Sequence, residues 1–188
     1  HKSFIGKLAG FFSKNCFYRA YIRFFCRTRS GVNIDCSGQF KGVPVIYCRT
    51  KKQGKYSEYF LQPDISEIQN YQLDFILRFG FNIIRGEILT SAKYGVWSFH
   101  HGDEKNYRGG PAGFWEIFYG EHSNGAVLQR LTDRLDAGVI LKKGYFKVLS
   151  HSYPAHIDQM LFSSATWPLA VCRDIVNGVA DYFEKETS

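Results

Sequence analysis

The chain has 188 residues, of which 45% are hydrophobic and 22% are charged, so a disordered chain is excluded and one globular domain with a substantial core is expected. The net charge of +7 keeps an anionic small molecule or a nucleic acid open as the partner. No apolar run reaches the roughly 18–20 residues of a membrane span. The five cysteines include no Cys-x-x-Cys pair, which argues against a disulfide framework or a zinc knuckle and predicts a reducing, cytoplasmic location.

The first part of the chain is predicted to open with a helix over about Phe4 to Arg27, because apolar residues recur there three and four positions apart. This helix is basic and aromatic, and we expect it to dock on the domain rather than lie on a membrane surface. A short β-branched strand is predicted at Val43 to Tyr47, a polar loop at Lys51 to Ser57, and a short helix at Ser66 to Tyr71.

The middle of the chain alternates strands and short helices. Asp74 to Phe81 is a continuous apolar run closed by a glycine, as expected for a buried parallel strand. A short helix is predicted at Ile88 to Ala92 and the next strand at Tyr94 to Phe99. The predicted elements that follow are a helix at Pro111 to Tyr119, strands at Ala126 to Leu131 and Val139 to Val148, and a helix from His156 to Phe183 interrupted at Trp167-Pro168.

Strands that alternate with helices predict an α/β fold with a central sheet that is mostly parallel and is flanked by helices. The late strand pair need not be parallel. We expect residues 1–188 to form a single domain, since no linker or internal repeat is visible. An α/β sheet of this type usually opens with a hydrophobic strand, whereas this chain opens with a helix. The first strand is therefore expected to lie upstream of the sequence or to be missing.

The stretch from Tyr94 to Tyr145 contains the residues best suited to catalysis. The predicted strand ends at His100 and His101, and a polar loop then runs to Arg108 and Gly109. Asp136 follows later in an Asp-Ala-Gly turn between two strands. A histidine and an aspartate brought together in this way can move a proton near neutral pH.

These residues resemble the formyltransferase family that uses 10-formyltetrahydrofolate as the formyl donor. The blocks that carry the resemblance, in the family's order, are Gly95 to His100, Arg108 to Pro111, Trp115 to Ile117, Gly120-Glu121, and Leu135 to Leu141. The resemblance implies a Rossmann-like formyltransferase fold and an enzyme that transfers a formyl group to a primary amine of a small metabolite or amino sugar. The implied partners are the folate donor and a small-molecule amine acceptor, with no nucleic acid, membrane or metal.

The resemblance also implies roles for individual residues. The implied catalytic residues are His100, Asp136 and Ser98, where His100 and Asp136 would relay protons and stabilise the tetrahedral intermediate. The residues expected to bind the folate are Asn82, Ile83, Ile84, Arg85, Leu135 and Gly138. The residues expected to bind the acceptor substrate are His101, Arg108 and Gly109.

Two departures from the family pattern keep other functions open. Ser98 stands where the family has an asparagine, and a hydroxyl is shorter than the amide that holds an oxyanion. The doubled histidine also occurs in the related formyltetrahydrofolate deformylases, which transfer the formyl group to water. The alternatives are therefore a formyltetrahydrofolate hydrolase, a catalytically degenerate ligand-binding module on the same fold, or a basic RNA-binding protein.

Overall fold

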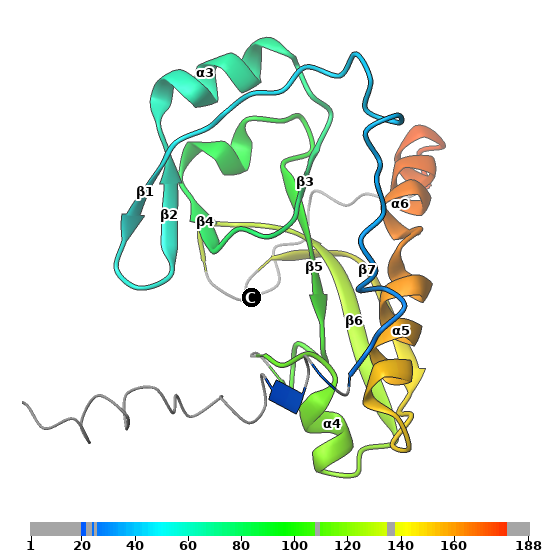
Figure 1. Ribbon diagram of the computed structural model, residues 1–188. Helices are drawn as coiled ribbons and strands as arrows, with labels where there is room; N and C mark the ends of the chain where they lie inside the picture. Colours follow the sequence, from blue (N-terminus) through cyan, green and yellow to red (C-terminus); the bar gives the residue numbers. More distant parts are fainter. Residues whose placement is uncertain (1–19, 22–23, 25, 108–109, 135–137, 180–188) are drawn as a thin grey trace, which may run out of the picture.

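The computed structural model describes residues 20–21, 24, 26–107, 110–134 and 138–179. They form two sheets and the helices that pack on them (Figure 1). The strands of the first sheet, in spatial order, are β1 (Thr50–Gln53), β2 (Ser57–Phe60) and β4 (Ile83–Arg85). Those of the second sheet are β3 (Ile76–Arg78), β5 (Val96–His101), β6 (Ser123–Arg130) and β7 (Val139–Lys147). The helices are α3 (Gln62–Asn70), the 3₁₀ helix η1 (Glu87–Thr90), α4 (Phe114–Phe118), α5 (Tyr153–Ser164) and α6 (Trp167–Val176).

The architecture confirms the predicted α/β, Rossmann-like class but corrects the expectation of a mostly parallel sheet. Strands β3 and β5 pair in parallel, as do β2 and β4, whereas β1–β2, β5–β6 and β6–β7 are antiparallel. A parallel pair needs a crossover of a dozen or more residues, usually a helix. The segment between β6 and β7 is shorter than that. The segment after β5 brings the chain back to the end of β5, so that β6 starts beside it and runs antiparallel, with His101 paired to Ala126.

A hydrophobic core lies between the second sheet and the C-terminal helices. Figure 1 shows α5 and α6 following one another along the side of β6 and β7. The buried residues of this core are Trp97, Ala126, Leu128, Leu141, Trp167 and Val171. Trp97 stacks on Phe75 with ring centroids 4.1 Å apart and donates its indole N–H to the carbonyl oxygen of Tyr94. This packing fixes β5 against the helices.

A second core joins the two sheets beneath α3 and η1. Its buried residues are Ile68, Ile84, Ile88, Leu89 and Val96. Because Val96 belongs to β5 and Ile84 to β4, this cluster holds the two sheets beside each other. The carboxyl ends of β4 and β5 are consequently fixed relative to one another.

Several predicted elements are confirmed in the second half of the chain. Strands β3, β5, β6 and β7, together with η1 and α4, lie where the sequence pattern predicted them, within a few residues. The C-terminal helix is interrupted before Trp167-Pro168, as predicted, because a proline cannot donate to the preceding turn. Helix α3 begins at Gln62, earlier than predicted, and carries Pro63 in its first turn, where a missing N–H costs nothing.

The predictions were wrong between residues 43 and 57. Val43 to Tyr47 forms no strand and is mostly exposed, whereas the predicted loop holds most of β1, the hairpin turn and the start of β2. Strand β1 reads Thr-Lys-Lys-Gln and is an edge strand, where lysines are common and no apolar alternation is needed. The predicted helix over Phe4 to Arg27 falls mostly outside the described residues. No described helix is long and apolar enough to cross a membrane.

Candidate active site

Strand β5 presents the two adjacent histidines to different surroundings, because side chains alternate along a strand. His101 packs against α5, with Nε2 3.1 Å from the Ser164 hydroxyl and its ring stacked on Phe99. Burial, and then the neighbouring charge of His100, lowers the pKa of His101 from 6.5 to about 4. His101 is thus a neutral residue held by α5, and the structure does not bring it to the pocket described below.

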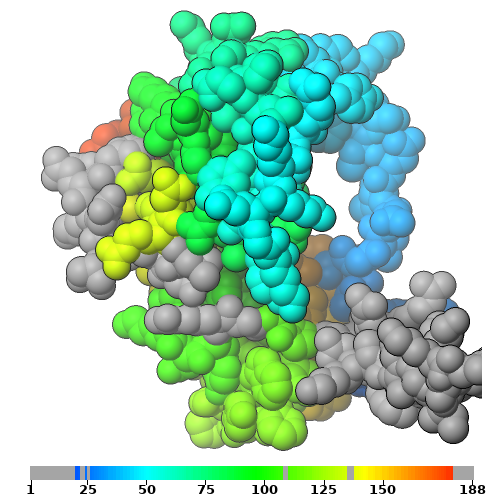
Figure 2. All heavy atoms as spheres, turned by 90° about the vertical axis from the view of Figure 1, so that its left-hand side faces the viewer, coloured from blue at the N-terminus to red at the C-terminus, as the bar shows by residue number. Residues whose placement is uncertain are grey.

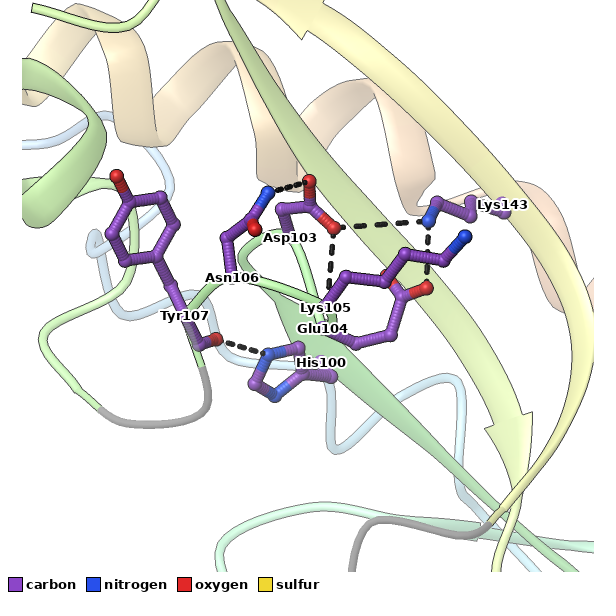
Figure 3. Close-up of polar contacts among 7 residues, drawn as sticks. All are labelled: His100, Asp103, Glu104, Lys105, Asn106, Tyr107 and Lys143. Carbon is purple, nitrogen blue, oxygen red and sulfur yellow. Dashed lines mark hydrogen bonds and ion pairs between the residues drawn. The ribbon is translucent and has the colours of Figure 1, made fainter. Parts of the chain in front are cut away.

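His100 lies beneath the loop that follows β5 (Figure 3). Its Nε2 is 3.1 Å from the backbone carbonyl oxygen of Tyr107. Since a carbonyl oxygen only accepts hydrogen bonds, this contact requires a proton on Nε2. In the neutral ring the other nitrogen, Nδ1, is then the basic atom. The loop therefore selects the tautomer with Nδ1 free to accept a proton.

The loop itself is tied down by its own charged residues (Figure 3). The Asp103 carboxylate accepts hydrogen bonds from the Lys105 backbone N–H at 3.2 Å and from the Asn106 amide at 2.9 Å. Lys143 of β7 reaches across to Glu104 at 2.6 Å and to Asp103 at 3.8 Å. These contacts position the Tyr107 carbonyl over His100 and connect the loop to β7.

A pocket of about 310 Å³ opens beside Ser98 and His100, which suits a small ligand or part of a larger one. Figure 2 looks onto the face of the molecule that carries the β1–β2 hairpin, with the yellow residues near 130 beside it. Six of the predicted site residues line this pocket: Ser98, His100, Ile83, Ile84, Arg85 and Gly138. The structure therefore brings together residues that the sequence assigned to catalysis and to folate binding.

The remaining predicted site residues lie elsewhere or outside the described residues. The side-chain amide of Asn82 does not line the pocket and donates to Glu58 at 2.7 Å. Asp136, Leu135, Arg108 and Gly109 fall outside the described residues, so the pairing of His100 with Asp136 stays a prediction. Arg134 and Gly138, the described residues next to positions 135–137, both line the pocket.

The pocket is electropositive. Three arginines line it, Arg78, Arg85 and Arg134, and no described acidic residue does. Arg85 donates to the Ser57 hydroxyl at 3.2 Å and to the backbone carbonyl of Asp133, while the Asp133 carboxylate accepts the Gly86 N–H at 3.0 Å. These bonds attach the 131–134 segment to the end of β4, and the two segments together form one wall of the pocket. An anionic group would be favoured in such surroundings.

Arg78 was missed as a site residue because it lies within the apolar run of β3. It is the register partner of Ser98 in β5, and its Nη1 donates to the Ser98 hydroxyl at 3.0 Å. Its Nη2 donates to the backbone carbonyls of Phe81 and Asn82. Burial lowers the pKa of Arg78. An arginine within an apolar run was the signal that could have identified it, because a charge is rarely placed in such a run without a partner.

Glu116 of α4 is a buried carboxyl group near His100. Its side chain is 1% exposed, and its Oε1 has no hydrogen-bond partner among the described residues. A Cβ placed on Gly102 would lie 3.3 Å from His100 Nε2 and 3.8 Å from Glu116 Oε1, so both atoms border the same glycine. Burial raises the pKa of Glu116. No described group of three or more His, Cys, Asp or Glu residues is placed to hold a metal ion.

Comparison with solved structures shows the fold. A glycinamide ribonucleotide transformylase from Symbiobacterium toebii superposes on 61% of this chain and 55% of its own, with a TM-score of 0.53 and 19% identity. A phosphoribosylglycinamide formyltransferase from Anaplasma phagocytophilum matches 60% of this chain and 56% of its own, at 18% identity and a TM-score of 0.49. A formyltetrahydrofolate deformylase from Pseudomonas syringae pv. tomato matches 61% of this chain and 39% of its own, at 18% identity and a TM-score of 0.45.

The chain thus shares the fold of the Symbiobacterium enzyme and spans about half of that enzyme's length. No protein-family model matches the chain.

Proposed function

We propose that this domain transfers a formyl group from 10-formyltetrahydrofolate to a primary amine of a small metabolite or amino sugar. The observation that carries the proposal is that Ser98 and His100 line one pocket, whose wall is built from the end of β4 and the 131–134 segment. A protein of the same fold is a glycinamide ribonucleotide transformylase, which fits this assignment.

The proposed reaction is an acyl transfer through a tetrahedral intermediate. The amine nitrogen bonds to the formyl carbon, and the carbonyl electron pair moves onto oxygen. His100, held by Tyr107 with Nδ1 as its basic atom, accepts the proton that the amine loses and returns it to N10 of the folate as that bond breaks. Asp136 is proposed to set the protonation state of His100.

The proposed binding roles divide between the two sides of the pocket. Ile83, Ile84, Arg85 and Gly138 line it on the side assigned to the folate. Leu135 belongs to the same proposed folate site, and Arg108 and Gly109 remain proposed contacts of the acceptor. We retain the single domain and the cytoplasmic location as proposals.

The test is to incubate the purified protein with 10-formyltetrahydrofolate, with and without a panel of amino sugars and other primary amines. We expect release of tetrahydrofolate that depends on one class of amine. In folded His100→Ala and Asp136→Asn proteins this release should be strongly reduced, by about 100-fold for His100→Ala. Formate release without any amine would identify a hydrolase instead. Absence of turnover in every condition, despite donor binding, would leave a ligand-binding module and contradict the proposal.

A further inference from the structure

The pocket contains a positively charged group in the place where a neutral amide is expected. Ser98 occupies the position of the family's asparagine, and its hydroxyl accepts the Nη1 hydrogen bond of Arg78 at 3.0 Å. Ser98 is only 2% exposed, so its hydroxyl is largely screened from solvent. The group that lies next to Ser98 and lines the pocket beside His100 is the guanidinium of Arg78.

Arg78 is held by several hydrogen bonds but has no countercharge among the described residues. The hydroxyl of Ser98 and the carbonyls of Phe81 and Asn82 accept three of its five N–H groups, and all three acceptors are uncharged. No described carboxylate forms an ion pair with Arg78, and its Nε–H is buried without a described partner. Arg78 is half-buried, so its charge is partly desolvated, and without a described countercharge the site favours an anion.

The other two arginines of the pocket are less suited to act beside His100. Arg85 is occupied by Ser57 and by the backbone carbonyl of Asp133, and both contacts direct it toward the pocket wall. Arg134 is exposed and comes from the segment that follows β6. Arg78 comes from β3, the direct neighbour of β5, and of the three arginines that line the pocket it is the one with a described hydrogen bond to Ser98.

We propose that Arg78 is a catalytic residue that binds the formyl oxygen, and that Ser98 is the positioning residue that holds it. This inference rests on the proposed formyl transfer. When the amine nitrogen bonds to the formyl carbon, the carbonyl electron pair moves to the oxygen, and the Arg78 N–H groups stabilise that charge. When the carbonyl re-forms, the bond to N10 of the folate breaks, and N10 takes the proton that the amine has lost. The arginine thereby replaces the amide of the family pattern.

Two substitutions test the charge and the geometry of this group separately. Arg78→Gln removes the charge, and Arg78→Lys keeps it but loses the forked donor. We expect kcat for formyl transfer to fall about 100-fold in Arg78→Gln, the usual loss for one oxyanion donor, with KM for the folate within a few-fold of wild type. The kcat of Arg78→Lys should lie between those of wild type and Arg78→Gln. Arg49→Gln is the matched control, because Arg49 is exposed and lies away from the pocket.

Ser98 gives a test that a merely structural role would not pass. Ser98→Ala should lower kcat with little change in KM, because it releases Arg78 without emptying the pocket. In the Arg78→Gln background, Ser98→Asn should restore part of the lost rate by supplying an amide. Wild-type kcat in folded Arg78→Gln protein, or no recovery in the double variant, would overturn the proposal.

Binding of ¹³C-formate, followed by NMR, separates this proposal from the proposed function. Weaker formate binding in Arg78→Gln, with binding preserved in Arg49→Gln and partly preserved in Arg78→Lys, supports Arg78 as the anion-binding group even if wild-type protein shows no turnover. In that case only the formyl-transfer function fails. Equal formate binding in all four proteins overturns the role of Arg78, whatever the turnover of the wild type.

Discussion

The two faces of β5 lie in different surroundings, one against the C-terminal helices and the other at the pocket. Trp97 and His101 pack toward the C-terminal helices, where burial keeps His101 neutral and Ser164 fixes its ring. Ser98 and His100 line the electropositive pocket on the other side. Because the strand is held by its helix-facing residues, the residues facing the pocket are free to carry polar groups. We therefore expect substitutions on the two faces to affect different properties, stability on one and catalysis on the other.

The largest effect is expected for Trp97→Ala on the helix-facing side. Trp97 is fully buried, stacks on Phe75 and donates to Tyr94, so its removal leaves a large cavity. We expect the free energy of unfolding to fall by about 3–5 kcal/mol, measured by urea denaturation. Phe79→Ala, at an exposed position, is the control and should change it by less than about 0.5 kcal/mol. A similar loss in both proteins would mean that β5 is not anchored by this core.

The second effect separates the two adjacent histidines. His100→Ala is expected to lower the rate of formyl transfer by about 100-fold, or about 2.7 kcal/mol of activation free energy, because it removes the proposed proton acceptor. His101→Gln should keep the rate within a few-fold, since His101 faces Ser164 rather than the pocket. Steady-state kinetics of both variants test this contrast. If His101→Gln is as inactive as His100→Ala, then the helix-facing residue at the end of β5 also affects catalysis, and the contrast between the two faces fails there.

Features of this arrangement that follow from local sequence patterns could be predicted. Features that depend on contacts between distant parts of the chain could not. The strand end at His100 and the turn near Gly138 follow from local patterns, and both residues line the pocket. The contact between Arg78 and Ser98 depends on which strands become neighbours, and the sequence pattern of β3 alone carries no information on that. The opposite surroundings of His100 and His101 required knowledge of where α5 packs. Strand β1 was missed because its four residues are polar and show no alternation.

The third effect is a pH dependence that comes from His101. Its pKa is depressed from 6.5 to about 4 in the folded protein, so its stabilising contribution is complete above pH 6.5 and is lost as the pH falls toward 4. We expect this loss to be on the order of 2 kcal/mol after allowing for solvent screening. His101→Gln cannot titrate and keeps a donor for Ser164, so its unfolding free energy should fall less over the same range. Parallel curves for the two proteins in urea denaturation at pH 7, 6, 5 and 4 would contradict this origin.

The smallest effect is a pH dependence of stability with the opposite sign, and it comes from Glu116, near the loop that covers His100. Burial raises the pKa of Glu116, so folding is favoured by its protonated form below its ordinary value of 4.5, and this contribution is lost as the pH rises through the raised pKa. Glu116→Gln mimics the protonated form at every pH. We expect it to match wild type near pH 4 and to be more stable by about 1 kcal/mol at pH 8, within the net range of one hydrogen bond.

The control for this measurement is Glu67→Gln, an exposed carboxylate of α3, which should show no such crossover in urea denaturation. If Glu116→Gln is less stable than wild type at pH 8, the carboxylate must be ionised and paired in the folded protein. Such an ionised Glu116 would place a negative charge beside the glycine that also borders His100.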